Sequence, residues 1–241
     1  LLSQITESQG ALYAPGTKGV VYQSVNGQDW KALNNTPTVK YLLGAIKVGG
    51  VNQPPVLASI IDKDGSLLFA AMNESLTWTE GNIVPANFPV SGFGSANHNV
   101  MYKERLTVAC GKSNSGQHCN SVWATMDGTS WAILTDEDDD SLEPCDGAML
   151  ARYDDKLFIL GGVNSSGQAS KTIYNSIDNG VSWSVIDTMV VFPETYKARG
   201  FSSVIVDKEN FMFVFGGKTG NNAKVLDEIW RGRINRLGFK D

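Results

Sequence analysis

The chain has 241 residues and a formal net charge of -5; 42% of its residues are hydrophobic and 19% are charged. With 25 glycines, this composition is typical of a globular protein rich in turns and argues against disorder. The 20 lysines and arginines are scattered rather than gathered in stripes, so we expect no nucleic-acid partner. No apolar run approaches the roughly 20 residues of a membrane-spanning helix, so no membrane span is expected.

A unit of about fifty residues recurs along the whole chain, which is the period of a repeat architecture. Tryptophan closes a similar phrase in four copies, at Trp30, Trp78, Trp131 and Trp183, and Phe239 takes the fifth equivalent place. The phrases are "SVNGQDW", "AMNESLTW", "TMDGTSW" and "SIDNGVSW". The sequence therefore contains one structural unit written five times.

Each copy divides into four short apolar stretches separated by Gly, Asn and Asp, a pattern that predicts successive antiparallel strands. The first copy reads "LLSQIT", "ALYAPG", "VVYQSV" and "DWKAL", and the fourth reads "GAMLARY", "KLFILGG", "KTIYNSI" and "SWSVI". In the fifth, the stretches are "FSSVIVD", "FMFVFGG", "EIWRGRI" and "RLGFK". We expect almost no helix, because no segment keeps a helical period. The five predicted units are residues 1–34, 37–82, 97–135, 146–187 and 199–241.

Four-stranded units of this size cannot close a core alone, but a radial arrangement buries both faces of each sheet against its neighbours. The sequence therefore predicts an all-β fold, with residues 1–241 forming a single β-propeller domain of five blades. If the chain is part of a longer protein, the ring has six or more blades. A longer protein could also carry an additional domain upstream of the propeller.

Two motifs resemble known propeller repeats. "FILGG" at 158–162 and "FVFGG" at 213–217 resemble the apolar run and double glycine of the kelch repeat, and "SIDNGVSW" at 176–183 resembles the Asp box of sialidases. Together they resemble the hybrid kelch and Asp-box propellers of uncharacterised bacterial envelope proteins. The resemblance implies a galactose oxidase-like propeller fold and a secreted or cell-envelope location.

We interpret the Asp-box phrases as structural turns. An Asp or Asn followed by Gly suits a tight strand-to-strand turn, and the sister phrases replace the aspartate by asparagine while keeping that turn. The residues assigned to this structural role are Ser176, Asp178, Gly180 and Trp183 in the fourth copy and Asp127, Gly128 and Trp131 in the third. A sialidase would need an arginine cluster and a tyrosine nucleophile from different blades, and three of the six arginines crowd into the last strand pair. The sequence does not favour that activity.

Long loops identify the face on which binding is expected. The connections between second and third strands, together with the crossings between blades, are long and share one edge, and long loops on a rigid scaffold often carry function. Aromatic rings beside polar groups suit a glycan or a protein partner, although the same residues also suit loop packing. The candidate ligand-binding residues on this face are Phe93, His98, Asp146, Phe192, Glu194, Tyr196, Lys197 and Arg199.

Catalysis and cofactors have weaker support. We expect a non-catalytic binding or scaffold protein with no metal and no cofactor; the alternative is a degenerate glycoside hydrolase or lyase that uses Asp146 and Glu194. A purely structural propeller is a third possibility. The acidic run Asp136 to Asp140 is interpreted as a solvated loop, with calcium binding as the alternative. Cys110 and Cys119 flank one predicted loop, where a disulfide is the alternative to free thiols.

Overall fold

The computed structural model describes residues 5–47, 54–90, 99–186, 192–220 and 225–233. In these ranges the chain forms nineteen β-strands and one 3-10 turn, η1 (Thr17–Gly19). The strands make five antiparallel sheets, and in each sheet strands that follow one another in the sequence are hydrogen-bonded neighbours. The expected all-β fold, built from antiparallel strands, is confirmed.

The first three sheets have four strands each. Blade 1 contains β1 (Thr6–Ser8), β2 (Ala11–Pro15), β3 (Val21–Ser24) and β4 (Lys31–Ala32). Blade 2 contains β5 (Thr38–Lys47), β6 (Pro55–Lys63), β7 (Ser66–Met72) and β8 (Trp78–Ile83). Blade 3 contains β9 (Asn99–Tyr102), β10 (Arg105–Ala109), β11 (Val122–Thr125) and β12 (Ala132–Thr135).

The last two sheets complete the series. Blade 4 contains β13 (Met149–Tyr153), β14 (Lys156–Leu160), β15 (Ile173–Ser176) and β16 (Ser184–Ile186). Blade 5 contains β17 (Ser203–Val206), β18 (Met212–Phe215) and β19 (Ile229–Gly232). The stretch "RLGFK", predicted as its fourth strand, lies outside the described residues.

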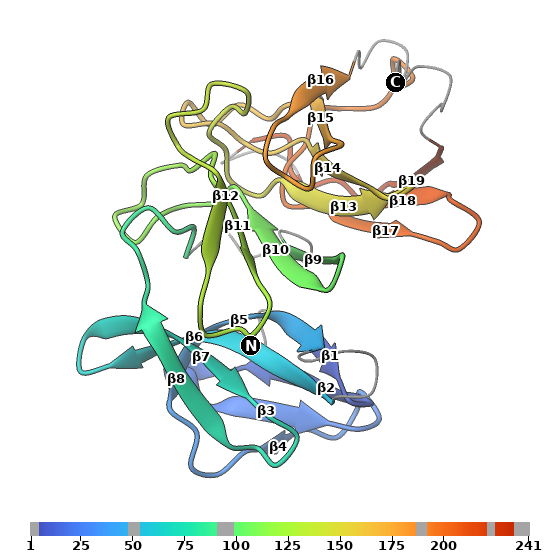
Figure 1. Ribbon diagram of the computed structural model, residues 1–241. Helices are drawn as coiled ribbons and strands as arrows, with labels where there is room; N and C mark the ends of the chain where they lie inside the picture. Colours follow the sequence, from blue (N-terminus) through green and yellow to red (C-terminus); the bar gives the residue numbers. More distant parts are fainter. Residues whose placement is uncertain (1–4, 48–53, 91–98, 187–191, 221–224, 234–241) are drawn as a thin grey trace.

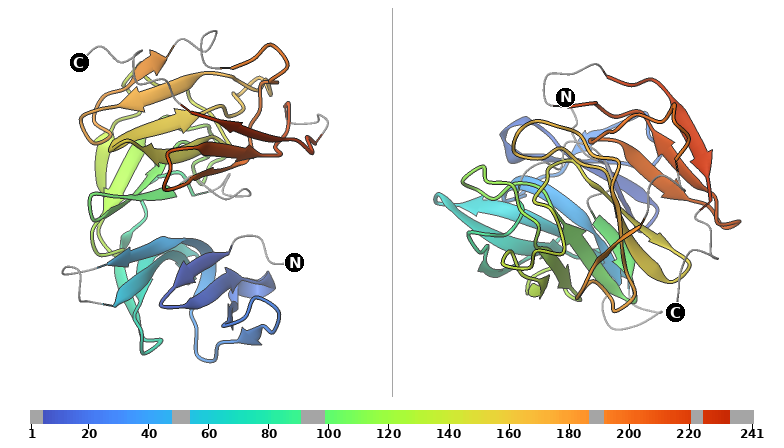
Figure 2. Two further views of the ribbon diagram at one scale, coloured as in Figure 1. Left: turned by 90° about the vertical axis from the view of Figure 1, so that its right-hand side faces the viewer. Right: turned by 90° about the horizontal axis from the view of Figure 1, so that it is seen from above.

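The five sheets follow one another around a common axis, in chain order (Figures 1 and 2). The first strand of each blade is the innermost, since β1 contacts β5, β5 contacts β9, β9 contacts β13 and β13 contacts β17. This radial arrangement of four-stranded meanders is a β-propeller with five blades.

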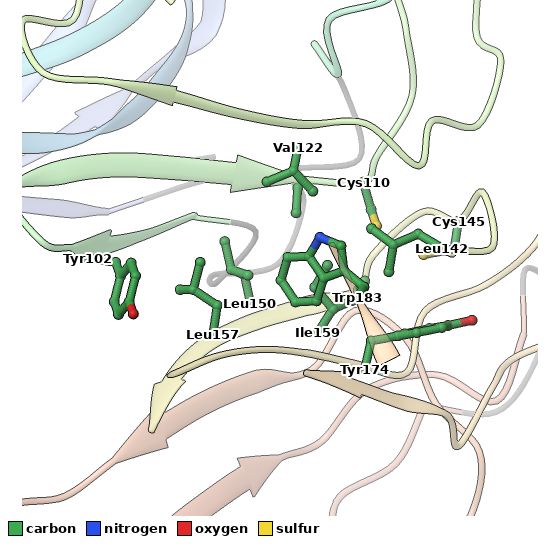
Figure 3. Close-up of a cluster of buried hydrophobic side chains, with 12 residues drawn as sticks. Tyr102, Cys110, Val122, Leu142, Cys145, Leu150, Leu157, Ile159, Tyr174 and Trp183 are labelled. Atoms are coloured by element: carbon green, nitrogen blue, oxygen red, sulfur yellow. The ribbon is translucent and has the colours of Figure 1, made fainter. Parts of the chain in front are cut away.

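Four hydrophobic clusters fill the spaces between consecutive blades. The one between blades 3 and 4 brings Val122 of β11 against Leu150, Leu157 and Ile159 of blade 4, as Figure 3 shows. The other three lie in the same way between blades 1 and 2, 2 and 3, and 4 and 5. Because both faces of an inner strand are covered, four consecutive residues of β14 are buried and its sequence is continuously apolar rather than alternating.

Candidate ligand-binding site on the loop face

The long connections gather on one edge of the propeller, which we call the loop face; its described segments are 84–90, 110–121, 136–148, 161–172, 192–202 and 216–220. In an antiparallel meander, the second-to-third strand loops and the crossings between blades share an edge. Backbone hydrogen bonds join these segments, such as Gly111 N to Cys145 O at 2.7 Å and Asp146 N to Val163 O at 2.9 Å. The loops therefore form a connected framework.

Pairs of residues with positive φ follow the second strands of blades 4 and 5, and they allow the loops to pack closely against the neighbouring crossings. Gly161 and Gly162 have φ values of 64° and 104°, and the equivalent Gly216 and Gly217 have 59° and 106°. A Cβ atom on Gly161 would overlap the carbonyl oxygen of Arg199 in the following crossing. Glycine is therefore required here both by conformation and by space. In blade 3 the first position of the pair is Cys110, at a φ of 59°.

The three cysteines are buried free thiols at the base of the loop face. Cys119 and Cys145 are paired across a β-bridge, and Cys145 belongs with Cys110 to the buried cluster between blades 3 and 4. Burial raises the pKa of the Cys119 thiol to about 11. The Cys145 pKa is also raised, by its hydrogen bond with Cys110 and by burial. Thiols in this state react slowly, so these side chains act as packing groups.

Asp146 is held in a buried ion pair. The residue is 3% exposed, and its Oδ2 lies 3.0 Å from Nζ of Lys112. Its other oxygen, Oδ1, has no hydrogen-bond partner among the described atoms, and the same holds for Nε2 of His118. Burial and the Lys112 cation lower the His118 pKa, against the opposing effect of Asp146. His118 is therefore neutral near pH 7, because its pKa lies below the ordinary value of 6.5.

A groove of about 870 Å³ opens beside this cluster. Its walls are the turn between β6 and β7, the crossing that follows β8, the loop between β10 and β11, and the crossing that follows β12. The amide side chains that line it belong to Asn87, Asn114, Gln117 and Asn120. Serine hydroxyls, the His118 ring and the carboxylates of Glu137 and Asp138 add to its polar surface. Its apolar part includes Leu67, Ile83, Val84, Pro85, Ala86 and Pro144.

Some of these polar groups already have partners in the protein, and others do not. Asn120 donates from Nδ2 to the carbonyl oxygens of Glu137, Asp139 and Leu142, so it fixes the third crossing against the loop. The exposed side chains of Asn114, Gln117 and Asp138 make no hydrogen bond within the described part of the chain. The groove therefore offers donors and acceptors on a fixed backbone. No lysine or arginine is among the described residues that line it, so its charge is negative.

Several residues selected from the sequence are located elsewhere. Phe93 and His98 lie outside the described residues. Tyr196 and Arg199 are buried, with exposures of 2% and 0%. The Arg199 guanidinium lies 4.2 Å from the Tyr196 ring centroid. It donates hydrogen bonds to the carbonyl oxygens of Lys197 and Gly216 and to the Glu228 carboxylate. Phe192 stacks on the other side of the Tyr196 ring, with centroids 3.9 Å apart. These three side chains pack blade 5 against the preceding crossing.

Glu194 and Lys197 are exposed on the same crossing. No hydrogen bond or ion pair joins Glu194 to Asp146 within the described residues, and Asp146 is committed to Lys112. The structure therefore brings together Phe192, Tyr196 and Arg199, whereas Asp146 belongs to the Lys112 cluster. The sequence signal for the groove was the length of the loop "GKSNSGQHCN"; amide residues such as Asn114 and Gln117 carry no motif that would single them out.

The predicted structural turns bind their own backbone. Oδ1 of Asp178 accepts from the amides of Val181 and Ser182, and Oδ1 of Asp127 accepts from those of Thr129 and Ser130. Burial opposes ionisation of both carboxyl groups, but these hydrogen bonds outweigh it and lower both pKa values. Ser176 accepts from the Gly180 amide in the same turn.

These turns also contact the preceding blade. Gly128 lies against Ala58 and Ala71 of blade 2, and Gly180 lies against Leu134 and Val122 of blade 3. The Trp131 ring stacks on Phe69 of blade 2 with centroids 5.4 Å apart. Each turn therefore fastens its own blade to the one before it.

Two carboxylates of the acidic run after β12 accept hydrogen bonds from neighbouring backbone amides. Oδ1 of Asp136 accepts from the Glu137 amide and Oδ1 of Asp139 from the Ser141 amide. Among the described residues, no three His, Cys, Asp or Glu side chains are grouped as metal ligands. Calcium binding stays a prediction. The part of the chain that the structure describes has no helix long and apolar enough to cross a membrane.

The fold and the groove together define a five-bladed β-propeller with a polar cleft on its loop face. The chain belongs to the family described as the DUF6242 beta propeller domain, whose model matches residues 1–241. No curated protein matches the sequence. The solved structure titled "Structure of YjhT" is similar with a TM-score of 0.64 and 13% identity over 95% of this chain and 80% of that one, a likeness of fold alone.

Proposed function

We propose that this propeller is a non-catalytic binding protein that recognises a glycan through the groove on its loop face. The observation that carries the proposal is the groove itself: uncommitted amide and carboxylate side chains stand on loops that the backbone hydrogen bonds hold in place. Such pre-organised polar groups bind a ligand without a large ordering cost. The proposal includes a secreted or cell-envelope location, as the kelch and Asp-box resemblance implies.

The chemistry of the groove favours a glycan over a protein partner. Sugar hydroxyls both donate and accept hydrogen bonds, which matches the amides of Asn114 and Gln117 and the carboxylate of Asp138. Protein interfaces are enriched in arginine side chains, and no arginine is among the described residues that line this groove. The carboxylates of Glu137 and Asp138 make the ligand a neutral or amino sugar rather than an acidic one.

Calorimetric titration with a panel of neutral, amino and acidic oligosaccharides tests this proposal. The variant is Gln117→Ala, which removes an exposed amide from the groove. We expect the dissociation constant of a bound neutral or amino sugar to rise by about fivefold, since a lost hydrogen bond is worth about 1 kcal/mol. Asn114→Ala is expected to act in the same direction.

The matched control is Gln28→Ala, because Gln28 is also exposed but lies in the turn between β3 and β4, on the opposite edge. It is expected to leave binding unchanged. Equal effects of the two glutamine variants would place the ligand outside the groove. If the panel gives no binding at all while a defined envelope protein binds and is lost in Gln117→Ala, the partner is a protein and the glycan proposal is wrong.

A further inference from the structure

Blade 5 has an apolar face that no blade covers in the described structure. Register pairs Ile205 with Phe213 and Phe215 with Ile229, so these four side chains project from one face of the sheet. Ser203 and Arg231 lie on the same face, and the Arg231 guanidinium carbon is 5.8 Å from the Phe213 ring centroid. Ile205 is 55% exposed and Ile229 is 66% exposed, and the two phenylalanines are half-buried. The opposite face, with Val204 and Val214, is buried against blade 4. We call the exposed side the front face of blade 5.

The same positions are covered in the preceding blade. When the strands are aligned on their double glycines, the front face of blade 4 consists of Ala151, Phe158, Leu160 and Ile173. These residues are 4%, 0%, 1% and 1% exposed, because blade 5 packs on them. Blades 1, 2 and 3 likewise present a front face to the blade that follows. The front face of blade 5 therefore has the chemistry of an inter-blade interface.

The back face of blade 1 is open in a matching way. Leu12 and Tyr22 lie on the side away from blade 2 and are only half-buried, whereas Tyr13 and Val21 face blade 2. The small side chains of Ala14 and Ser24 lie on the same side as Leu12 and are buried. A Cβ atom on Gly27, in the turn between β3 and β4, would meet only Leu12 of its own blade. The equivalent Gly128 and Gly180 lie against the preceding blade. No cluster of buried residues joins blade 5 to blade 1 among the described residues, and Figure 2 shows these two blades at the two ends of the arc.

We propose that a sixth four-stranded blade of the same repeat, carried by the same polypeptide, occupies the space between the front face of blade 5 and the back face of blade 1. A blade is the occupant that fits, since it has two apolar faces and both open surfaces require one. Exposed apolar faces of this kind are a marker of an interface rather than of a free surface.

Thiol labelling tests this proposal, because the three native cysteines are buried and contribute little reactivity. Ile229→Cys reports on the front face of blade 5, and Val185→Cys is the control, since Val185 is 62% exposed on β16. Both variants are made in residues 1–241 and in the polypeptide of the complete reading frame. The maleimide reaction rate of each cysteine is measured under native conditions at several protein concentrations.

In residues 1–241 we expect Ile229→Cys and Val185→Cys to react at similar rates. In the complete polypeptide the cysteine at position 229 is expected to react at least about tenfold more slowly than the control, at every concentration, because a covering blade excludes the reagent. Fast labelling in both forms would overturn the proposal, as would a reading frame that adds no four-stranded repeat. Slow labelling already in residues 1–241 would mean that blade 5 meets blade 1 directly. Protection that develops only at high protein concentration would mean that a second copy covers the face. Either result contradicts the proposal.

Discussion

The indole of Trp183 donates from Nε1 to Oγ1 of Thr135 over 3.0 Å, which joins the turn of blade 4 to the last strand of blade 3. The same threonine hydroxyl donates to the carbonyl oxygen of Gly180 over 2.6 Å. Thr135 is 1% exposed and Trp183 is 6% exposed, so both bonds are shielded from water. One side chain of blade 3 thus satisfies two polar groups of the following blade.

Thr135→Val is expected to lower the free energy of unfolding by about 2–3 kcal/mol, because it leaves a buried donor and a buried acceptor without partners while keeping the side-chain shape. Urea unfolding followed by tryptophan fluorescence measures the change. Thr79→Val, at an exposed position of β8, is the control and should change stability little. Equal stability of the two variants would show that the inter-blade hydrogen bonds contribute nothing.

The turn carboxylates give the protein a predicted sensitivity to acid. The folded-state pKa values of Asp127 and Asp178 lie below 3.8, so their ionised form stabilises the fold above that pH, and this contribution is lost as the pH falls through the folded-state values. The Asp127→Asn/Asp178→Asn double variant keeps the Oδ1 acceptor, as Asn26 and Asn73 do in blades 1 and 2. It should lose less stability than the wild type between roughly pH 5 and pH 2. Urea midpoints across this range test the expectation, and parallel losses would contradict it.

The repeat made the fold predictable from the sequence. The tryptophans at positions 30, 78, 131 and 183 and the turn residues before them recur at one interval, and each strand boundary is marked by Gly, Asn or Asp. Local turn chemistry and apolar runs therefore carried the information that sets the topology. The covered and open faces of the blades were not predictable, since Ile229 and Ile173 are the same residue type and differ only in what lies against them.

The site was harder to predict, because the sequence cannot distinguish an aromatic that binds a ligand from one that packs a loop. Tyr196 and Arg199 have side chains that suit a ligand, yet Tyr196 is buried and Arg199 is both buried and hydrogen-bonded within the protein. Asn114 and Gln117 lie in the groove but belong to residue types common in any loop. Only the meeting of loops and crossings from neighbouring blades gives them a shared surface.

The glycine pair of blade 4 is expected to be intolerant of side chains. Gly161→Ala places a Cβ atom against the Arg199 carbonyl oxygen at a φ of 64°, so we expect a loss of at least about 3 kcal/mol in the free energy of unfolding. Gly65→Ala is the matched control, since its φ is 84° but nothing lies within 4 Å of the added Cβ atom. It should cost only about 1 kcal/mol. Similar losses in urea unfolding would show that conformation alone, and not the close approach of the crossing, requires glycine here.

Arg199 is expected to matter for stability. Arg199→Met removes the donors to Lys197 O and Gly216 O from a fully buried side chain, so the free energy of unfolding should fall by about 2–3 kcal/mol. It also leaves the Glu228 carboxylate without its cation. Arg152→Met, at an exposed position of β13, is the control and should be nearly neutral. Glu228 has a pKa lowered from its ordinary value of 4.5 by its hydrogen bonds with Trp230 and Arg199. The difference in unfolding free energy between Arg199→Met and the wild type should therefore shrink as the pH falls through the folded-state pKa of this carboxyl. Urea unfolding at neutral and acidic pH measures both effects, and a difference that stays constant with pH would contradict the role assigned to the Arg199–Glu228 pair.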